Sequence, residues 1–141
     1  MKTQRTLPFT ALLIFVFTLA LGYSNAAIAQ EGAPKLKVEE FEKLSKKDKK
    51  GVILDIRTPE EYKEGYIEGA EFLDFLGQDF ESGLEKMNKK KTYYVYCRSG
   101  KRTIAATEKM KQMGFKKVYM LDGGITAWSE SGRQTIKNDN Q

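Results

Sequence analysis

The sequence predicts one α/β domain, in which a parallel β-sheet is covered by helices on both faces. Short apolar runs alternate with helical patterns along most of the chain, and this alternation is typical of parallel sheets. The chain has 141 residues, of which 40% are hydrophobic, with eight Phe and seven Tyr, and this composition excludes a disordered chain. Beyond the first 30 residues about 110 remain, enough for one domain with one core.

The first 29 residues resemble a secretory signal peptide. Lys2 and Arg5 form a short basic start, residues 7–21 are mostly apolar, and Ala27-Ile28-Ala29 is a small-x-small cleavage pattern. An uncleaved membrane anchor is the alternative, although the apolar run is shorter than the about 20 residues that a spanning helix needs. We therefore expect an exported protein, periplasmic in a Gram-negative cell, with no membrane contact after cleavage.

The predicted domain covers residues 37–131, between a polar tether at 30–36 and a flexible tail at 132–141. Its first strand is expected at the apolar run 52–56. A helix should follow, because Thr58 can cap it, Pro59 suits its first position and Glu61 completes a capping box. Gly65 then ends this helix.

The rest of the domain repeats the same alternation. The helix after the third strand should end at Gly114, a residue suited to the left-handed position that follows a helix, with Phe115 making the accompanying apolar contact. Gly123 and Gly124 should lead into a last helix that carries Trp128. The expected strands lie at 72–75, 92–96 and 118–121, and the expected helices at 80–87 and 101–113.

Composition removes many kinds of active site. The chain has one cysteine and no histidine, which excludes an internal disulfide, metal sites built on several cysteines, and all histidine-based catalysis. We expect no metal and no organic cofactor. A net charge of +5 is too small to indicate nucleic-acid binding, which needs a concentrated basic face.

The segment that carries chemistry begins at Cys97, directly after the strand expected at 92–96. In open α/β sheets, sites form at the carboxyl ends of strands. Loop amides, the start of the next helix and the cations of Arg98, Lys101 and Arg102 should all favour a thiolate at this point. Gly100 suits a tight turn. A preformed thiolate is a nucleophile that needs no general base, which fits a chain without histidine.

This loop resembles the active-site loop of the single-domain rhodaneses, a family of sulfurtransferases. Further segments resemble the family's motifs in the family's order. They are Leu54-Asp55-Ile56-Arg57-Thr58-Pro59-Glu60-Glu61-Tyr62, Gly65-Tyr66-Ile67-Glu68-Gly69-Ala70, Gly114-Phe115 with Val118, and Leu121-Asp122-Gly123-Gly124-Ile125-Thr126-Ala127-Trp128. Tyr66 replaces the family's usual histidine, at a position that we expect to support the fold.

The resemblance implies a three-layer fold with a parallel sheet of about five strands, and a sulfur-transfer cycle on Cys97. By analogy, Cys97 takes the outer sulfur of a small anionic donor such as thiosulfate, becomes a persulfide, and passes the sulfur to cyanide or a thiol. The loop residues Arg98, Ser99, Gly100, Lys101 and Arg102 would bind the donor, with Arg102 the first candidate among the cations. Asp55 and Arg57 would support the site, as a structural ion pair or through donor contact.

Two other functions stay open from the sequence. A non-catalytic module could carry persulfide sulfur for a dedicated protein partner, or sense oxidation at an exposed Cys97. A cysteine phosphatase or arsenate reductase is the other, but phosphatases use a C-x5-R loop. Here the second arginine falls at C-x4-R, and Thr103 occupies the phosphatase arginine position.

Overall fold

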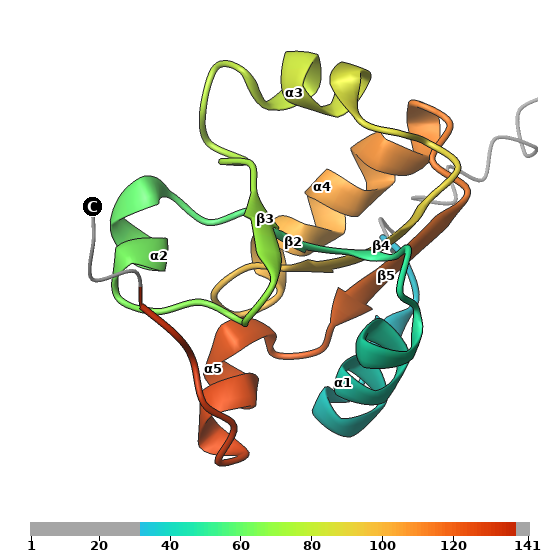
Figure 1. The fold of residues 1–141 in the computed structure, drawn as a ribbon. Helices are drawn as coiled ribbons and strands as arrows, with labels where there is room; N and C mark the ends of the chain where they lie inside the picture. Colours follow the sequence, from blue (N-terminus) through green and yellow to red (C-terminus); the bar gives the residue numbers. More distant parts are fainter. Residues whose placement is uncertain (1–31, 138–141) are drawn as a thin grey trace, which may run out of the picture.

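The computed structural model describes residues 32–137 and shows one five-stranded sheet (Figure 1). The strands are β1 (Lys35–Leu36), β2 (Val52–Asp55), β3 (Ala70–Phe72), β4 (Thr92–Tyr96) and β5 (Lys117–Leu121). All neighbouring pairs run parallel, in the order β1-β5-β4-β2-β3. The α/β class and the five-stranded parallel sheet expected from the sequence are therefore confirmed.

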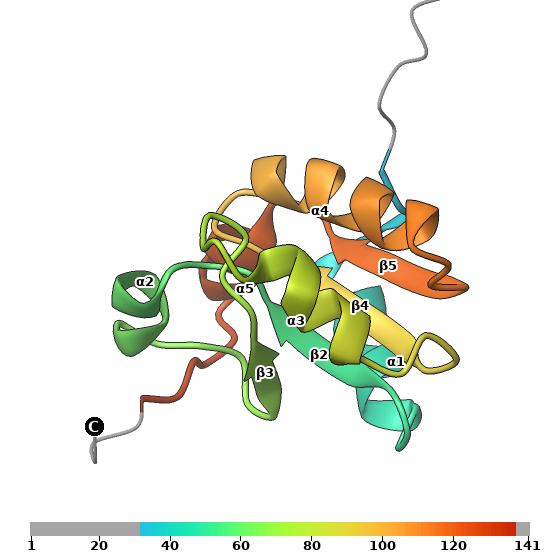
Figure 2. The same cartoon turned by 90° about the horizontal axis from the view of Figure 1, so that it is seen from above.

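Among the described residues, four helices connect these strands and a fifth follows β5. They are α1 (Val38–Lys47), α2 (Pro59–Lys63), α3 (Phe80–Lys86), α4 (Lys101–Gln112) and α5 (Gly124–Glu130). The apolar faces of α3 and α4 pack on one side of the sheet, and those of α1 and α5 pack on the other (Figure 2). The fold thus has three layers, with a separate apolar cluster on each face of the sheet.

Local sequence signals set two helix ends as predicted. Thr58 caps α2 with a reciprocal capping box to Glu61, and Pro59 occupies the first turn. At the end of α4, Gly114 has a φ of 93°, and the amides of Gly114 and Phe115 donate to the carbonyls of Lys111 and Met110. These paired hydrogen bonds form a Schellman motif.

The strand expected at 72–75 is displaced, because β3 lies at Ala70–Phe72. Strand β3 pairs with β2 only as far as Asp55, which is opposite Phe72 and is the last residue of β2. The amides of Leu73 and Phe75 still donate to the carbonyls of Asp55 and Ile56, but from an irregular loop. The alternation of Ala70, Glu71 and Phe72 on an exposed edge carries too little apolar signal to locate the strand.

Residues 30–36 are not simply a polar tether, since their described part joins the sheet. Lys35–Leu36 forms β1 beside β5, and Ala33 and Leu36 are buried. The amide of Ala33 also donates to the Thr107 hydroxyl. A strand of two residues has no periodicity that could be recognised in the sequence, and its position depends on pairing with a distant strand.

The tail expected from residue 132 is likewise held to the domain as far as Ile136. Ile136 pairs with Tyr66 in an antiparallel bridge, and the Trp128 indole donates to the carbonyl of Gln134. Arg133 binds Glu42 of α1 at 2.7 Å. The predicted signal peptide at 1–29 lies outside the described residues. Between residues 32 and 137, no helix is both long and apolar enough to cross a membrane.

Candidate active site

The predicted loop lies at the carboxyl end of the central strand. Strand β4 has β5 on one side and β2 on the other, ends at Tyr96, and is followed by Cys97. Helix α4 begins at Lys101, and Gly100 adopts a φ of 91° immediately before it. The chain therefore turns sharply between strand and helix, and the left-handed conformation at the turn favours glycine.

The turn directs one backbone amide at the cysteine sulfur. The N–H of Gly100 donates to Sγ of Cys97 at 3.2 Å, which is the type of contact that stabilises a thiolate. Cys97 itself is only 1% exposed and is packed among apolar residues on the α4 side of the sheet. The exposed thiol that the oxidation-sensor alternative requires is therefore absent.

Helix α5 fixes the orientation of the peptide groups in this loop. The amides of Ile125 and Thr126 donate to the carbonyls of Cys97 and Arg98 at 2.9 and 3.1 Å. In a trans peptide the N–H points opposite to the carbonyl, so the amides of Arg98 and Ser99 point away from α5. Gly124 permits this approach, because a Cβ there would overlap both carbonyl groups.

The three cations of the loop have different roles. Arg98 and Lys101 are exposed, and neither forms an ion pair within the described part of the chain. Arg102 instead makes a two-pronged ion pair with Glu61 of α2, with both N–O distances 2.6 Å. The pKa of Arg102 is raised chiefly by its hydrogen bonds to Glu61, and the nearby Cys97 sulfur adds to the shift.

Glu61 is a site residue that the sequence analysis assigned only to helix capping. Its Oε2 atom accepts from the Thr58 amide and from Arg102, so one carboxylate both caps α2 and orients the arginine beside Cys97. The Arg102 hydrogen bonds lower the pKa of Glu61 from 4.5 to about 2. The capping box could locate Glu61 in the sequence, but no local pattern indicates a partner 41 residues away.

Asp55 and Arg57 form the structural ion pair that was one of their two expected roles. Their side chains are 0% and 5% exposed, and the closest N–O distance is 2.6 Å. Arg57 also donates to the backbone carbonyls of Glu61 and Gly65, and it lies over the ring of Tyr96. This pair therefore connects the end of β2, helix α2 and the strand that leads into Cys97.

Tyr96 completes this buried network, although its sequence pattern indicates only a strand residue. Its hydroxyl accepts a hydrogen bond from the Ile67 amide at 3.1 Å. Burial, together with Asp55, raises the pKa of the phenol, so Tyr96 stays neutral. Tyr66, which replaces the family's histidine, is 7% exposed and packs edge-on against Phe72. It lies with the residues that support the fold.

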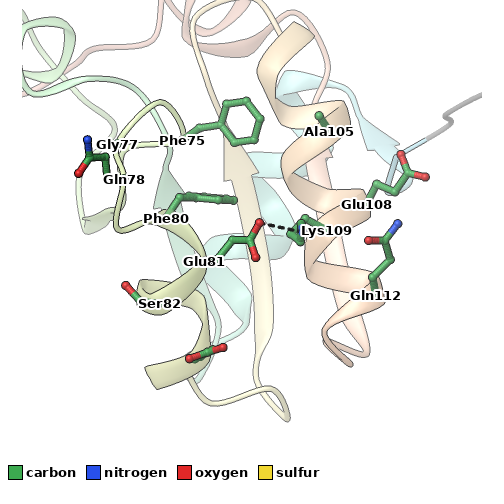
Figure 3. Close-up of a pocket in the computed structure, with 11 residues that line it drawn as sticks. Phe75, Gly77, Gln78, Phe80, Glu81, Ser82, Ala105, Glu108, Lys109 and Gln112 are labelled. Carbon is green, nitrogen blue, oxygen red and sulfur yellow. Dashed lines mark ion pairs between the residues drawn. The ribbon is translucent and has the colours of Figure 1, made fainter.

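Two small cavities flank the loop. One, of about 140 Å³, is lined by Ser99, Gly100 and Lys101, with Lys35 of β1 nearby. The other, of about 300 Å³, lies between α2 and α5 and includes Arg98. A larger groove of about 780 Å³ between α3 and α4 contains no residue of the loop (Figure 3). Within residues 32–137 no cluster of side chains is arranged to hold a metal.

The chain is similar to several known proteins. The rhodanese-like domain family matches residues 37–131. YrkF of Bacillus subtilis, named for a sulfur-carrier role, is 33% identical over 111 residues, which are 79% of this chain but only 59% of that protein. A mitochondrial protein of Schizosaccharomyces pombe, named for thiosulfate sulfurtransferase activity, is 32% identical over 108 residues, covering 64% of this chain and 76% of the relative. A crystal structure of a rhodanese-like domain protein from Staphylococcus aureus superposes with a TM-score of 0.65 at 25% identity, covering 75% of this chain and 99% of that one.

Proposed function

The chain belongs to the rhodanese family, whose domains act as sulfurtransferases or sulfur carriers, and on this premise we propose that Cys97 catalyses sulfur transfer. Its donor is thiosulfate or a similar small anion, and its acceptor is cyanide or a thiol. The amide of Gly100, held 3.2 Å from Sγ, is the observation that carries this proposal. This hydrogen bond stabilises negative charge on the sulfur, so the thiolate can form without a general base.

The cycle has two covalent steps. The Cys97 thiolate attacks the outer sulfur of thiosulfate, the sulfur–sulfur bond of the donor breaks, and sulfite leaves with the bonding electron pair. The acceptor then attacks the outer sulfur of the resulting persulfide. The bond between this sulfur and Sγ breaks, and its electron pair stays on Sγ, which becomes a thiolate again. Because the two substrates react in separate steps, ping-pong kinetics are expected.

The free cations favour an anionic donor. Among residues 32–137, Arg98 and Lys101 are exposed and have no ion-pair partner. The cavity of about 140 Å³ places Lys101 beside Ser99 and Gly100. A guanidinium group can bind two oxygens of such a donor at once. Both terminal nitrogens of Arg102 already bind the Glu61 carboxylate. We therefore propose that Arg102 stabilises the sulfur and that Arg98 and Lys101 make the first contact with the donor.

The phosphatase alternative receives no support from the loop. Thr103, at the position of the phosphatase arginine, is fully buried and cannot clamp an oxyanion outside the loop. The sulfur-carrier alternative remains, because a carrier needs the first step of the cycle and differs only in its acceptor. We also propose, from residues 1–29, that the protein is exported to the periplasm.

Mass spectrometry tests this function directly. After incubation with thiosulfate and removal of the donor, the protein should gain the mass of one sulfur atom, and Cys97→Ser should gain none. Formation of thiocyanate with cyanide then separates an enzyme from a carrier that releases sulfur only to a protein. Unchanged mass, together with phosphate release from an aryl phosphate, would refute sulfur transfer and favour the phosphatase.

A further inference from the structure

Lysine is concentrated at one end of the molecule, in the three segments that lead into β2, β4 and β5. These segments are residues 46–51, 87–91 and 113–117, and they carry nine lysines but only one acidic residue, Asp48. Their combined charge is +8, whereas the whole chain has +5, so the rest of the chain sums to −3. We refer to this surface as the lysine edge. Its lysines are Lys46, Lys47, Lys49, Lys50, Lys89, Lys90, Lys91, Lys116 and Lys117.

The topology of the sheet brings these three segments together. Strands β5, β4 and β2 are neighbours and run parallel, so they begin at the same end of the sheet. Thr92, the first residue of β4, is opposite Lys117, and Tyr93 is opposite Val52, the first residue of β2. Because neighbouring strands are about 4.8 Å apart, the segments form one continuous surface where β2, β4 and β5 begin (Figure 2).

The one acidic residue of the lysine edge is already engaged. The Asp48 carboxylate accepts from the Lys50 amide at 3.2 Å, and it also bonds the side chain of Thr92, which does most to lower the pKa of Asp48. Lys117 is close enough to add to this shift. Asp48 therefore joins the first segment to β4 and β5, and it leaves the other lysines without a negative partner.

Most lysines of the edge are exposed and free. Lys46 pairs with Glu42 within α1, and Lys89 is half-buried. The other seven are exposed, and within residues 32–137 none of them forms an ion pair. Like charges repel one another, so this concentration of unpaired lysines destabilises the fold unless an anionic partner is bound.

The chemistry of the lysine edge fits an anionic lipid surface better than a folded protein or a nucleic acid. Protein interfaces are poor in lysine and depend on apolar anchors. The exposed large apolar side chains of the described residues are Phe72, Leu76 and Ile136, and all lie outside the three segments. Sites for nucleic acids combine arginines with exposed aromatic rings, but the lysine edge has no arginine and its one aromatic ring, that of Phe115, is buried. Lipid headgroups need only several positive charges on one face, and flexible lysines supply them.

The lysine edge lies at the opposite end of the sheet from Cys97. The five residues of β4 separate Lys91 from Cys97, and they span about 17 Å at the rise of a parallel strand. This length exceeds the distance of about 8 Å over which charges act strongly in physiological salt. A membrane at the lysine edge would therefore leave the loop accessible and would not repel a small anionic donor.

We propose that the lysine edge binds anionic lipid headgroups and holds the domain on a membrane surface, with the Cys97 loop directed away from it. Each lysine close to such a surface strengthens binding by about fivefold. The sequence analysis expected no membrane contact after cleavage, but it considered only an apolar anchor, whereas this contact is electrostatic. The proposal does not depend on sulfur transfer at Cys97.

Binding of the full chain to lipid vesicles tests this proposal. The vesicles contain phosphatidylcholine alone or with an equal part of phosphatidylglycerol, and sedimentation gives the partition coefficient for each. The measured quantity is the ratio of the two coefficients, because apolar attraction by residues 1–29 acts on both kinds of vesicle and cancels. Anionic vesicles should bind at least about a hundredfold more tightly at low salt. This preference should nearly vanish at about 1 M salt, which screens the charges.

Two double variants locate the binding surface. Lys50→Gln with Lys90→Gln removes one charge from each of two segments and should lower the ratio by about twentyfold. Adding Lys116→Gln from the third segment should lower it by about a further fivefold. The matched control is Lys63→Gln with Lys137→Gln, which removes two exposed charges outside the lysine edge and should change the ratio by less than about twofold. Equal losses in the two double variants would overturn the proposal.

Two soluble polymers separate lipid from other anionic partners. Polyglutamate represents an acidic protein, and a DNA duplex represents nucleic acid. If either polymer binds with the same dependence on Lys50 and Lys90 while anionic vesicles do not bind, the lipid assignment is wrong. Sulfur loading at Cys97 is measured on the same vesicle-bound protein. Vesicle binding without loading would refute the proposed function alone, and loading without the predicted vesicle preference would refute the lysine edge alone.

Discussion

At the scale of single residues, the ion pair between Glu61 and Arg102 links acidity to the geometry of the site. The carboxylate serves two donors at once, the Thr58 amide and the Arg102 guanidinium, and both side chains of the ion pair are 21% exposed. Because Arg102 lies close to Cys97, protonation of Glu61 would release the arginine that we propose stabilises the sulfur.

Glu61→Gln should remove a stabilisation that depends on pH. The folded-state pKa of Glu61 is lowered from 4.5 to about 2, so its contribution is complete above pH 4.5 and is lost as pH falls towards 2. We expect the variant to be less stable by about 1–2 kcal/mol at neutral pH, after allowing for solvent screening. Urea unfolding should show the difference shrinking between pH 4.5 and 2. A difference that stays constant over this interval would contradict the assigned pKa.

Gly124→Ala should damage the loop more than an ordinary glycine substitution. Gly124 and Gly132 both have positive φ, at 62° and 80°, but only Gly124 faces the Cys97 and Arg98 carbonyls. Gly132→Ala should therefore cost only the conformational penalty of about 1–2 kcal/mol. Gly124→Ala should cost more and also slow sulfur uptake from thiosulfate. Equal stability and equal uptake in the two variants would show that α5 does not hold the loop.

At the scale of elements, α2 acts as the support for Glu61. This five-residue helix is too short to be stable alone, and it is fixed by the Thr58 capping box, by Arg57 bound to the Glu61 carbonyl, and by Arg102 bound to the Glu61 carboxylate. Loss of one support should therefore affect both stability and chemistry.

Thr58→Ala tests this role of α2. Loss of the cap should lower the free energy of unfolding by about 1 kcal/mol and slow sulfur uptake, although less than Glu61→Gln does. Ser45→Ala is the control, because the Ser45 hydroxyl bonds a carbonyl within α1 and caps nothing. Its effect should stay within about 0.5 kcal/mol. Thermal unfolding and the rate of sulfur loading at Cys97 should be measured for all three variants. An unchanged loading rate in Thr58→Ala would show that α2 does not influence sulfur transfer.

The elements also show how far the sequence could predict this structure. Signals contained within a few residues were sufficient for the caps of α2 and α4, for β2 and β4, and for the turn after Cys97, because these depend on neighbouring side chains and backbone angles. Strand β1, the bridge at Ile136 and the bond between Glu61 and Arg102 depend on partners distant in the chain, and their own segments have no periodic pattern. The α5 amides that orient the loop belong to this second group.

At the scale of the whole molecule, the Asp55–Arg57 pair joins regions that the chain order keeps apart. Asp55 ends β2, which lies between β3 and β4, while Arg57 reaches the carbonyls of Glu61 and Gly65 and the ring of Tyr96. Strand β4, helix α2 and the chain at Gly65 are thereby held together at the carboxyl end of β2. Breaking this pair should affect all three.

Asp55→Leu and Arg57→Met should each destabilise the fold by about 3–5 kcal/mol, because each leaves one buried charge without its partner. The double variant should cost clearly less than the sum of the two single variants, since it removes both charges. Urea unfolding of the four proteins gives this double-mutant cycle, and simple additivity would contradict a buried pair. Arg57→Met should also slow the loading of Cys97 with sulfur more than Asp55→Leu does. Of the two residues, only Arg57 donates to the backbone carbonyls of Glu61 and Gly65. These bonds position α2, on which Glu61 holds Arg102 beside the sulfur.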